Sequence, residues 1–396
     1  MKVLHVVCSL SPMRGGITQA VLDMVLALRN IGIDAEIVTT NHNMTEVLNV
    51  SLEQWINYQE VPVYFLPYFH VPILLIREFM FSWKLTTWLW KNIKNYDLLH
   101  IHALFSYPVT VSMMIARLRQ IPYINQPHGL LCEWSLQQSK LKKKIYLSLI
   151  EKSNLRSSNT LQVTSTKELE ELKYLKLGVS STLVPLGLHL SDPIPNAKQK
   201  VRDMFNIPPE HKIILFMSRF HYKKGLDYLI PALSQLKTQN FTFILAGSGD
   251  PEYENTVNEL LTKNNLEHCT FRPGFVKGEI KDILLQGSDI FALTSHSENF
   301  GIVVLEAMAA GLTTIVTPGV ALADMIEENQ LGYVTKLDST EITKVIQYCL
   351  NHPEEARKIG ERASEFIHIN YTWNNIAIKT ASVYQEVINN SNMKMR

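Results

Sequence analysis

The sequence predicts an α/β protein of two domains, each built on a parallel sheet, which face each other across a cleft. The chain has 396 residues, and a single hydrophobic core rarely grows past roughly 250–300 residues. Short apolar runs alternate with helix-length segments, which is typical of parallel strands covered by helices on both faces. This alternation occurs twice and breaks once, over residues 184–199, where three prolines fall.

The first alternating series occupies residues 1–187, the predicted first domain. Its helix-length segments include Gln19–Asn30 and Pro108–Arg119. A further segment, Val71–Trp90, is interrupted by charged residues, so it predicts an amphipathic helix rather than a membrane span. The predicted strands of this domain are Val3–Cys8, Ala35–Thr39, Val61–Leu66, Leu98–His102, Tyr123–Gln126, Thr160–Thr164 and Ser181–Val184.

The second series occupies residues 188–372, the predicted second domain. Ligands of open α/β sheets bind beyond the carboxyl ends of the strands, so we expect the functional residues just after strands. The predicted strands are Lys212–Met217, Thr242–Ala246, Thr270–Arg272, Ile290–Leu293, Thr313–Val316 and Gly332–Val334.

Charge and cysteine content argue against several classes of protein. The net charge is +1, which gives no global basic field for nucleic acid. Residues 1–190 carry 18 Lys and Arg against 13 Asp and Glu, and the remainder carries 20 against 24. The first half is therefore better placed to approach an anion, unless this is ordinary surface variation. Four widely separated cysteines without a CxxC motif argue against zinc and disulfides and fit a reducing cytoplasm. The short apolar run at the first residues does not fit a signal peptide.

A glycine pair and a histidine follow strands of the first domain. Gly15 and Gly16 precede a helix, where backbone N–H groups can approach an anion, although a plain tight turn fits equally well. The pattern is not GxGxxG, so a nicotinamide cofactor is not supported. His128 lies in QPHG, where a ligand contact and a loop-stabilising role are both open. His100 and His102 alternate along a strand end, and we expect them to be structural.

Two cations follow the first strand of the second domain. Arg219 ends that strand and Lys224 lies five residues on, at the predicted start of a helix. An arginine fork, a lysine point charge and a helix N-terminus together suit a diphosphate. A solvated basic turn is the alternative.

The segment HSENFGIVVLEAMAAG, which follows Ile290–Leu293, is the most informative motif. It places Glu298 in a loop, Gly301 at a close backbone approach and Glu306 in a helix that starts near Ile302. Carboxylates at both ends of this turn can accept hydrogen bonds from two hydroxyl clusters, such as a sugar and a ribose. A helix cap and a surface acid are the alternative interpretations.

The pairs Arg219/Lys224 and Glu298/Glu306, with the glycine turn and the terminal segment YTWNNIAIKTASVYQEVI, resemble glycosyltransferase family 4. The resemblance covers nearly the whole chain, and the region around INQPHGLLCEWSLQQ resembles members that build bacterial exopolysaccharides. It implies the GT-B architecture of two Rossmann-like domains. Residues 1–187 would form the acceptor-side domain, completed by a helix at about 373–390, and residues 188–372 would bind the nucleotide-sugar donor.

The resemblance also implies site roles. Arg219 and Lys224 would hold the donor diphosphate, Glu298 the donor sugar and Glu306 the ribose. His128 would lie near the transferred sugar, which makes Arg219, Lys224, Glu298 and His128 the expected catalytic group. Further donor contacts are expected from Gly15, Gly16, Arg272, Phe275, Asn299, Phe300, Gly301 and Ile302.

By the same resemblance, the expected activity is retaining transfer of a hexose from UDP-glucose to a glycan or lipid-linked acceptor in polysaccharide biosynthesis. The chain contains no Asp-x-Asp, so we expect transfer without metal or other cofactor. The expected location is cytoplasmic, where an association with the inner face of the membrane is left open, and no nucleic-acid partner is expected. The alternatives are a non-catalytic nucleotide-sugar-binding module and an epimerase- or phosphorylase-type enzyme of the same architecture. A basic run that suits an anionic lipid headgroup, or else forms a solvated helix face, comprises Lys140, Lys142, Lys143 and Lys144.

Overall fold

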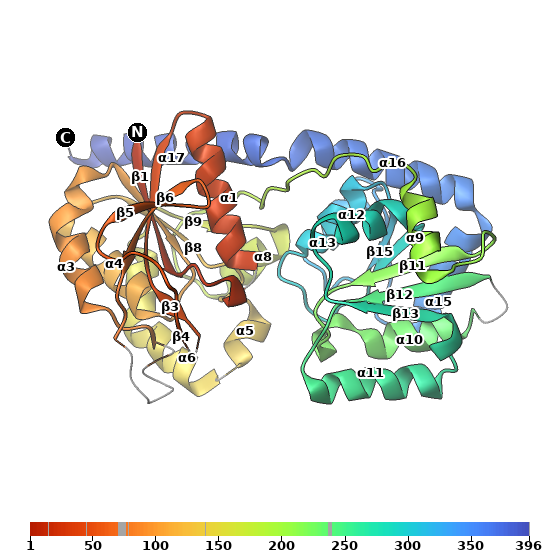
Figure 1. Ribbon diagram of the computed structural model, residues 1–396. Coiled ribbons are helices and arrows are strands. Elements are labelled where there is room, and N and C mark those ends of the chain that lie inside the picture. Colours follow the sequence, from red (N-terminus) through yellow and green to blue (C-terminus); the bar gives the residue numbers. More distant parts are fainter. Residues whose placement is uncertain are drawn as a thin grey trace. The chain divides into compact units, whose positions relative to one another are not determined.

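The computed structural model describes every residue except 15, 45, 70–76, 78, 139, 237–239 and 396. The chain divides into two compact units. Unit 1 comprises Met1–Gly187 and Trp373–Arg396, and unit 2 comprises Leu188–Thr372. Each unit has its own parallel sheet with helices packed around it (Figure 1).

The sheet of unit 1 has eight strands among the described residues, in the order β10-β9-β8-β7-β1-β2-β6-β5. All neighbours pair in parallel except the edge strand β5, which runs antiparallel to β6. The predicted strands are confirmed, but the sequence analysis missed β5 and the small β3–β4 pair, which are short and partly exposed. The strands are β1 Lys2–Ser9, β2 Asp34–Thr40, β3 His42–Asn43, β4 Glu46–Val47, β5 Trp55–Tyr58, β6 Val61–Leu66, β7 Leu98–His102, β8 Tyr123–Gln126, β9 Thr160–Val163 and β10 Ser181–Leu183.

Helices cover both faces of this sheet, and α1 and α4 lie on opposite faces (Figure 1). The crossovers β1–α1–β2 and β7–α4–β8 step in opposite directions along the strand order, so right-handed connections require this arrangement. The helical segments are η1 Pro12–Arg14, α1 Gly16–Asn30, α3 Trp83–Asn92, η2 Ile93–Asn95, α4 Tyr107–Arg119, α5 Glu133–Gln137, α6 Lys140–Tyr146, η3 Leu147–Glu151, α7 Lys152–Arg156, α8 Thr166–Tyr174 and α17 Trp373–Met395.

The C-terminal helix α17 is a part of unit 1 and packs against α1 (Figure 1). Its buried side chains recur at three- and four-residue spacing, which forms one apolar stripe along the helix. This stripe includes Trp373, Ile376, Ala377, Thr380, Tyr384 and Val387.

The helix predicted over Val71–Trp90 is interrupted at Met80–Ser82, whereas its last part, Trp83–Trp90, is helical as predicted. Met80 has a φ of 56°, which interrupts the helix, and the Ser82 side chain then caps a new helix by accepting from the Leu85 amide at 3.3 Å. The new helix, α3, therefore begins at Trp83. Residues 71–76 and 78 of the predicted segment lie outside the described residues.

The sheet of unit 2 is parallel throughout, with six strands among the described residues in the order β13-β12-β11-β14-β15-β16. All of its predicted strands are confirmed. They are β11 Lys212–Met217, β12 Phe241–Ala246, β13 Thr270–Gly274, β14 Ile290–Leu293, β15 Thr313–Val316 and β16 Tyr333–Val334. The strands β12 and β13 are added in turn on one side of β11, and the strands β14, β15 and β16 are added in turn on its other side. The strand order therefore reverses between β11 and β14.

The helices of unit 2 separate successive strands, as the alternating pattern predicts. Lys224 lies in a short 3-10 turn just before α10 rather than in the helix itself. The helical segments are α9 Ala197–Phe205, η4 Tyr222–Lys224, α10 Leu226–Ser234, α11 Pro251–Lys263, η5 Glu267–Cys269, α12 Gly278–Gly287, α13 Ile302–Ala309, α14 Ala323–Glu328, α15 Ser339–Asn351 and α16 Pro353–Asn370.

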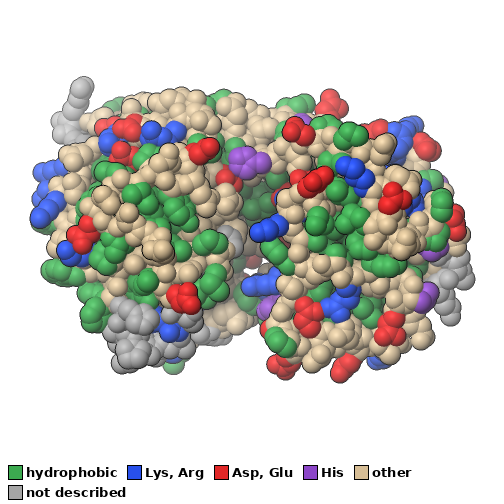
Figure 2. Space-filling model, viewed as in Figure 1, with side chains coloured by type: hydrophobic (Ala, Val, Ile, Leu, Met, Phe, Trp, Pro, Cys, Tyr) green, Lys and Arg blue, Asp and Glu red, His purple; other side chains and the backbone are tan. Residues whose placement is uncertain are grey.

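The surface of each unit mixes charges of both signs. Figure 2 shows Lys and Arg side chains interspersed with Asp and Glu over the visible face. On this face neither unit gathers a basic field of the kind that binds a nucleic-acid backbone. Among the described helices, not one combines the length and the apolar character needed to cross a bilayer.

Candidate functional site

The predicted donor residues of unit 2 follow two adjacent strands at the point where the strand order reverses. Arg219 and Lys224 follow β11, and Glu298 follows β14, which pairs with β11 in parallel. Ligands of doubly wound sheets bind beyond the carboxyl ends of strands at such a reversal. The topology therefore brings the cations and the carboxylate to the edge where an anionic ligand is expected.

The loops after β11 and β14 are joined to each other. The His296 amide donates to the Lys223 carbonyl at 2.8 Å, and the Thr294 hydroxyl donates to the Gly225 carbonyl at 2.9 Å. Gly225 has a φ of 69°, and a Cβ there would lie 1.8 Å from the Thr294 carbonyl oxygen. Only glycine permits this close approach, which seats the turn before α10 against the end of β14.

As a result, Lys224 and Glu298 form an ion pair at the carboxyl edge of the sheet. Their side chains are only 16% and 18% exposed. The structure thus unites two residues that lie 74 positions apart and that the sequence analysis assigned to a single ligand. In the absence of a ligand the two charges neutralise each other.

The loop that carries Glu298 is fixed by backbone hydrogen bonds. The Glu298 amide donates to the Gly319 carbonyl at 2.9 Å, and the Glu298 carbonyl accepts from the Ala321 amide at 3.1 Å. The Glu298 carboxylate also accepts from the Asn299 amide at 3.1 Å. Gly301, with a φ of 87°, then starts α13 at Ile302, as the sequence predicts. The free amides at this helix start make the edge favourable for an anion.

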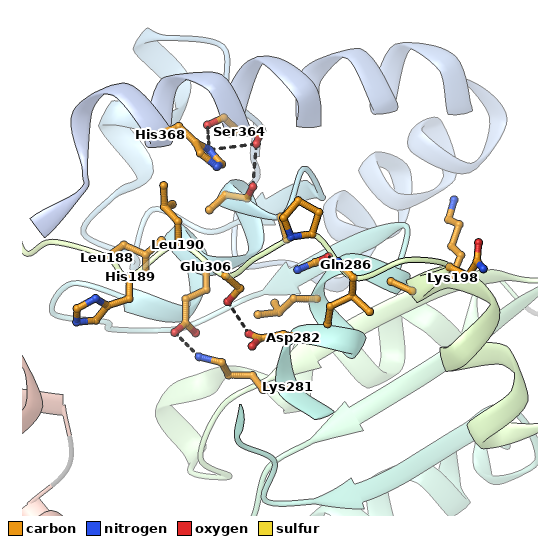
Figure 3. A pocket seen from close by; sticks show the side chains of 18 residues that line it. Leu188, His189, Leu190, Lys198, Lys281, Asp282, Gln286, Glu306, Ser364 and His368 are labelled. Atoms are coloured by element: carbon orange, nitrogen blue, oxygen red, sulfur yellow. Dashed lines mark hydrogen bonds and ion pairs between the residues drawn. The ribbon is translucent and has the colours of Figure 1, made fainter. Parts of the chain in front are cut away.

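Glu306 lies within α13 and pairs with Lys281 of α12 at 2.7 Å (Figure 3). Both line a pocket of unit 2 with a volume of about 470 Å³, whose wall also includes Ser191 hydrogen-bonded to Asp282 at 2.8 Å (Figure 3). The sequence analysis missed Lys281. A lysine in the first turn of a helix carries no local signal, because its partner is set by the packing of α12 beside α13.

Arg219 is exposed at the end of β11. The next polar side chain, His221, accepts a hydrogen bond from the Lys223 amide at 3.2 Å. Partial burial, and then the nearby charges of Arg219 and Lys223, lower the pKa of His221. Burial and these two positive charges therefore all disfavour a proton on His221.

Arg272 and Phe275 do not join the Lys224–Glu298 pair. The Arg272 guanidinium forms an ion pair with Glu254 and also donates to Asn258 of α11, and it lies 5.4 Å from the centre of the Phe220 ring. Phe275 is exposed. Of the other predicted donor contacts, Phe300 is buried and Ile302 is the first residue of α13.

In unit 1, Gly16 is the first residue of α1, directly after the loop that follows β1. Gly15 lies outside the described residues. The Thr18 hydroxyl donates to the Ser11 carbonyl at 3.2 Å, which fixes this helix start against the loop.

His128 lies in a tight loop after β8, with a φ of 52° followed by Gly129 at 75°. The buried Glu168 holds this loop: one carboxylate oxygen accepts from the Gly129 amide at 2.6 Å, and the other accepts from the Thr164 amide at 2.8 Å. Burial raises the pKa of Glu168, whereas the hydrogen bonds from these amides lower it. His128 is one of fourteen described non-glycine residues with a positive φ, a conformation that is found at functional sites as well as in turns.

His100 and His102 are fully buried, and His102 contacts His128 through its Nδ1 at 3.1 Å. The expectation that His102 is only structural is therefore incomplete, because His102 directly contacts the candidate site residue His128. Within the part of the chain that the structure describes, one trio could ligate a metal, namely His5, His100 and His102. No local signal in the sequence connects His5 to the other two, because β1 and β7 are brought together by the sheet.

The fold is that of the GT-B proteins, two Rossmann-like units with a C-terminal helix that returns to the first. The crystal structure of Anabaena HepE in complex with UDP and glucose aligns over 98% of this chain and 100% of its own, with a TM-score of 0.75 and 19% identity. Sucrose-phosphate synthase from Thermosynechococcus elongatus aligns over 98% and 99%, with a TM-score of 0.74 and 21% identity.

Two family models match the chain. The glycosyl transferase 4-like domain matches residues 15–187 and the glycosyl transferases group 1 domain matches residues 197–366. Together they span most of the chain, which belongs to the family 4-type glycosyltransferases. An uncharacterized glycosyltransferase of Methanocaldococcus jannaschii is 26% identical over 74% of this chain and 76% of its own length. D-inositol 3-phosphate glycosyltransferase of Corynebacterium glutamicum is 23% identical over 96% and 93%.

Proposed function

We propose that this glycosyltransferase moves glucose from UDP-glucose, with retention of configuration, to a glycan or lipid-linked acceptor in polysaccharide biosynthesis. The observation that carries the proposal is the Lys224–Glu298 pair at the strand-order reversal of unit 2. The similar fold of HepE, which has been crystallised with UDP-glucose, supports the choice of donor.

In this proposal, donor binding replaces the Lys224–Glu298 pair with two new sets of contacts. The Lys224 ammonium and the Arg219 guanidinium bind the diphosphate oxygens, and the Glu298 carboxylate accepts hydrogen bonds from the sugar hydroxyls. Glu306 accepts from the ribose hydroxyls, with Lys281 holding its carboxylate in place. Each charge that is neutralised in the free protein therefore finds a partner in the donor.

Departure of the nucleoside diphosphate builds negative charge on its β-phosphate. Fixed cations and the free amides at the start of α13 stabilise this charge, and such preorganised groups lower the barrier without reorganisation. Because the sequence has no Asp-x-Asp to hold a metal, these groups carry the task in a metal-independent transfer. The departing phosphate then helps to deprotonate the acceptor hydroxyl on the same face of the sugar.

The test is Lys224→Ala, assayed for transfer from UDP-glucose and for UDP binding by thermal shift. We expect kcat to fall by about 10²–10³, because one preorganised donor to the developing charge is lost. The melting temperature without ligand should fall, because Glu298, whose side chain is only 18% exposed, loses its partner, so turnover and binding are compared below both unfolding transitions. Lys344→Ala, which removes an exposed lysine of α15, is the matched control. Wild-type turnover in the Lys224 variant would contradict the proposal.

We also place the enzyme at the cytoplasmic face of the membrane. Leu141, Ile145 and Leu149 recur every four residues and are 72%, 50% and 75% exposed, beside the exposed Lys142 and Lys144. Exposed apolar residues flanked by lysines suit an anionic bilayer surface. Of the basic run, Lys143 instead donates to the Ser135 carbonyl at 2.7 Å, and the Lys140 side chain lies outside the described residues.

Vesicle co-sedimentation tests this location. The wild-type protein should pellet with phosphatidylglycerol-containing vesicles and not with neutral ones, and a Leu141→Glu/Leu149→Glu double variant should stay in the supernatant. Ile378→Glu, which changes an exposed apolar residue of α17, should bind like the wild type. Equal vesicle binding by all three proteins would show that the surface around Leu141 and Leu149 does not bind the membrane.

A further inference from the structure

A continuous chain of polar side chains runs through the interior of unit 1 from α17 to the His128 loop. His100 Nδ1 lies 2.6 Å from the Tyr384 hydroxyl, which lies 3.4 Å from His5 Nε2. His5 Nδ1 lies 2.9 Å from His102 Nε2, and His102 Nδ1 lies 3.1 Å from His128 Nε2. The first four members of this chain are fully buried, and His128 retains 7% exposure.

The ring geometry is that of hydrogen bonds within the ring planes. The His5 and His102 rings are tilted by 15° with centroids 5.2 Å apart, and the His102 and His128 rings by 28° with centroids 5.4 Å apart. In each pair the centroid separation exceeds the nitrogen–nitrogen distance by about two ring radii. The two centroids and the two nitrogens therefore lie nearly on one line, which is the favourable geometry for N–H···N bonding.

A hydrogen-bonded chain describes these rings better than a metal site. Tetrahedral ligands at about 2.0–2.1 Å from a zinc ion would be separated by roughly 3.3 Å. His5 Nδ1 and His102 Nε2 lie closer than this, at the distance of a direct hydrogen bond. His100 Nδ1 is also engaged by Tyr384. The nitrogens are thus already paired with each other and with the hydroxyl.

Each ring of the chain is neutral and carries one N–H. Burial lowers the pKa of His5 to about 3 and that of His128 to about 4, and burial with the neighbouring rings lowers the pKa of His100 and His102 well below its usual range. A neutral imidazole donates from one nitrogen and accepts at the other. His102 and His5 each use both nitrogens within the chain, and the Tyr384 hydroxyl between His5 and His100 has a single proton. All the bonds of the chain therefore point in the same direction.

The far end of the chain distinguishes the two directions. His100 Nε2 is buried and makes no hydrogen bond of normal geometry to the described residues. If the bonds ran from His128 toward His100, this nitrogen would be an orphaned N–H, whereas the opposite direction leaves it as a bare lone pair. Orphaned buried N–H groups are rarer than unsatisfied acceptors. The nearby Gln126 side chain raises the pKa of His100 as a hydrogen-bond partner, but its amide nitrogen and oxygen, like His100 Nε2, make no hydrogen bond of normal geometry.

We propose that the chain His100–Tyr384–His5–His102 holds His128 as its Nδ1–H tautomer, so that His128 acts as a hydrogen-bond donor to a substrate oxygen. In this direction His102 Nδ1–H donates to His128 Nε2, which leaves Nδ1–H as the free group of His128. His102 and His5 are then positioning residues that act through His128. The nature of the substrate oxygen, a sugar hydroxyl, rests on the proposed function, but the tautomer does not.

The direct test is ¹⁵N NMR of the full-length protein labelled at histidine, at pH 7 and without ligand. Protonated and bare ring nitrogens have well separated shifts. The proposed direction makes all four chain histidines Nδ1–H tautomers, against the Nε2–H form that free imidazole side chains prefer. The four belong to 13 histidines in the sequence, and each is assigned by the signal that disappears in its His→Phe variant. Finding the four as Nε2–H tautomers would overturn the proposal.

Two variants distinguish a role of His102 in positioning the His128 proton from a general role in packing the core. His102→Phe keeps an aromatic ring, somewhat larger than imidazole, but removes the donor to His128. His128 should therefore shift to the Nε2–H form, and kcat should fall about 10- to 100-fold with UDP affinity unchanged. Tyr384→Phe disturbs the same core but keeps the segment His5–His102–His128. The far end is then His5 Nε2, which is again less costly as a bare lone pair than as an orphaned N–H, so His128 should remain Nδ1–H. Unchanged turnover and an unchanged His128 tautomer in His102→Phe would refute the positioning role. If all four histidines are Nδ1–H but the protein transfers no glucose, the proposed reaction is wrong and the proposed direction of the histidine hydrogen bonds is still correct.

Discussion

Two ion pairs of unit 2 carry no net charge, because the lysine of each pair faces a carboxylate. Lys224 faces Glu298, and Lys281 faces Glu306 at 2.7 Å. All four side chains are less than a third exposed, so their mutual attraction is screened less than that of a surface pair. A donor must therefore compete with Glu298 for Lys224, and its affinity depends on that competition.

The competition predicts opposite effects of Glu298→Gln on binding and on transfer. Without the carboxylate charge, Lys224 is free for the diphosphate, so UDP should bind several-fold more tightly by calorimetry. The weaker acceptors of the amide hold the sugar less well, so kcat with UDP-glucose should fall at least tenfold. Asp250→Asn, which alters the N-cap of α11, serves as a control with a neutralised carboxylate outside the pair. Weaker UDP binding in Glu298→Gln would contradict the competition.

At the scale of elements, the site depends on how two loops meet at the end of the sheet. The turn before α10 reaches Glu298 because Gly225 packs against the Thr294 carbonyl and His296 bonds to Lys223. The short turn Tyr222–Lys224, rather than a helix, lets the Lys224 side chain point along the sheet edge to its partner.

Gly225→Ala should therefore damage both stability and donor binding. The added Cβ would lie 1.8 Å from a backbone oxygen at a φ of 69°, so the turn must move away from β14. We expect a loss of about 1–3 kcal/mol in the free energy of unfolding and a large loss of UDP affinity, measured by denaturant titration and calorimetry. Gly311→Ala is the matched control, because Gly311 has a φ of 81° with nothing within 4 Å of its Cβ position. It should lose some stability but keep UDP affinity.

The strands β1 and β7 and the helix α17 enclose neutral histidines, which makes the stability of unit 1 depend on pH. The pKa of His5 is lowered to about 3 and that of His128 to about 4 by burial, below the ordinary value of about 6.5. Between those values the unfolded chain binds more protons than the folded one, so stability is complete above pH 6.5 and falls as the pH decreases.

The expected slope is about 1.4 kcal/mol per pH unit for each such histidine once the unfolded side chains are protonated. Chemical denaturation followed at pH 7.5, 6.5 and 5.5 measures it through the unfolding transition of unit 1. Replacing His5 by Phe removes one of these protonations and should make the decline shallower. A stability that is constant from pH 7.5 to 5.5 would show that the buried rings do not stay neutral.

At the scale of the whole molecule, the two units depend differently on the C-terminal segment. The helix α17 completes unit 1: Tyr384 is fully buried beside His100, and a Cβ at Gly187 would lie 2.4 Å from the Trp373 ring. The donor residues Arg219, Lys224, Glu298 and Glu306, in contrast, lie between Leu188 and Thr372.

Truncation after Thr372 should therefore unfold unit 1 selectively. Loss of α17 exposes its buried apolar stripe and the histidine chain, so the thermal transition of unit 1 should be lost or fall steeply in calorimetry. Unit 2 should retain its transition and bind UDP, as should a fragment of residues 188–372. If the truncated chain kept the unit 1 transition, α17 would be an accessory helix rather than a part of the core.

Much of the fold could be predicted because buried parallel strands appear as short apolar runs with sharp ends, such as Val61–Leu66 and Ile290–Leu293. The edge strand Trp55–Tyr58 was missed because only one of its neighbours is a strand and its residues are half-exposed. The break before α3 was missed because Ser82 acts as a cap only through its local geometry.

The sequence by itself determined the two α/β units, the strand-end positions of Arg219, Lys224, Glu298 and Glu306, and the family that these motifs indicate. These properties follow from local patterns of apolar, glycine and charged residues. Only the tertiary structure decided that Lys224 pairs with Glu298, that Lys281 pairs with Glu306, and that Tyr384 closes a chain of histidines ending at His128. Those contacts join residues up to 379 positions apart, and the sheet order and helix packing that bring them together are not encoded in any single stretch of the chain.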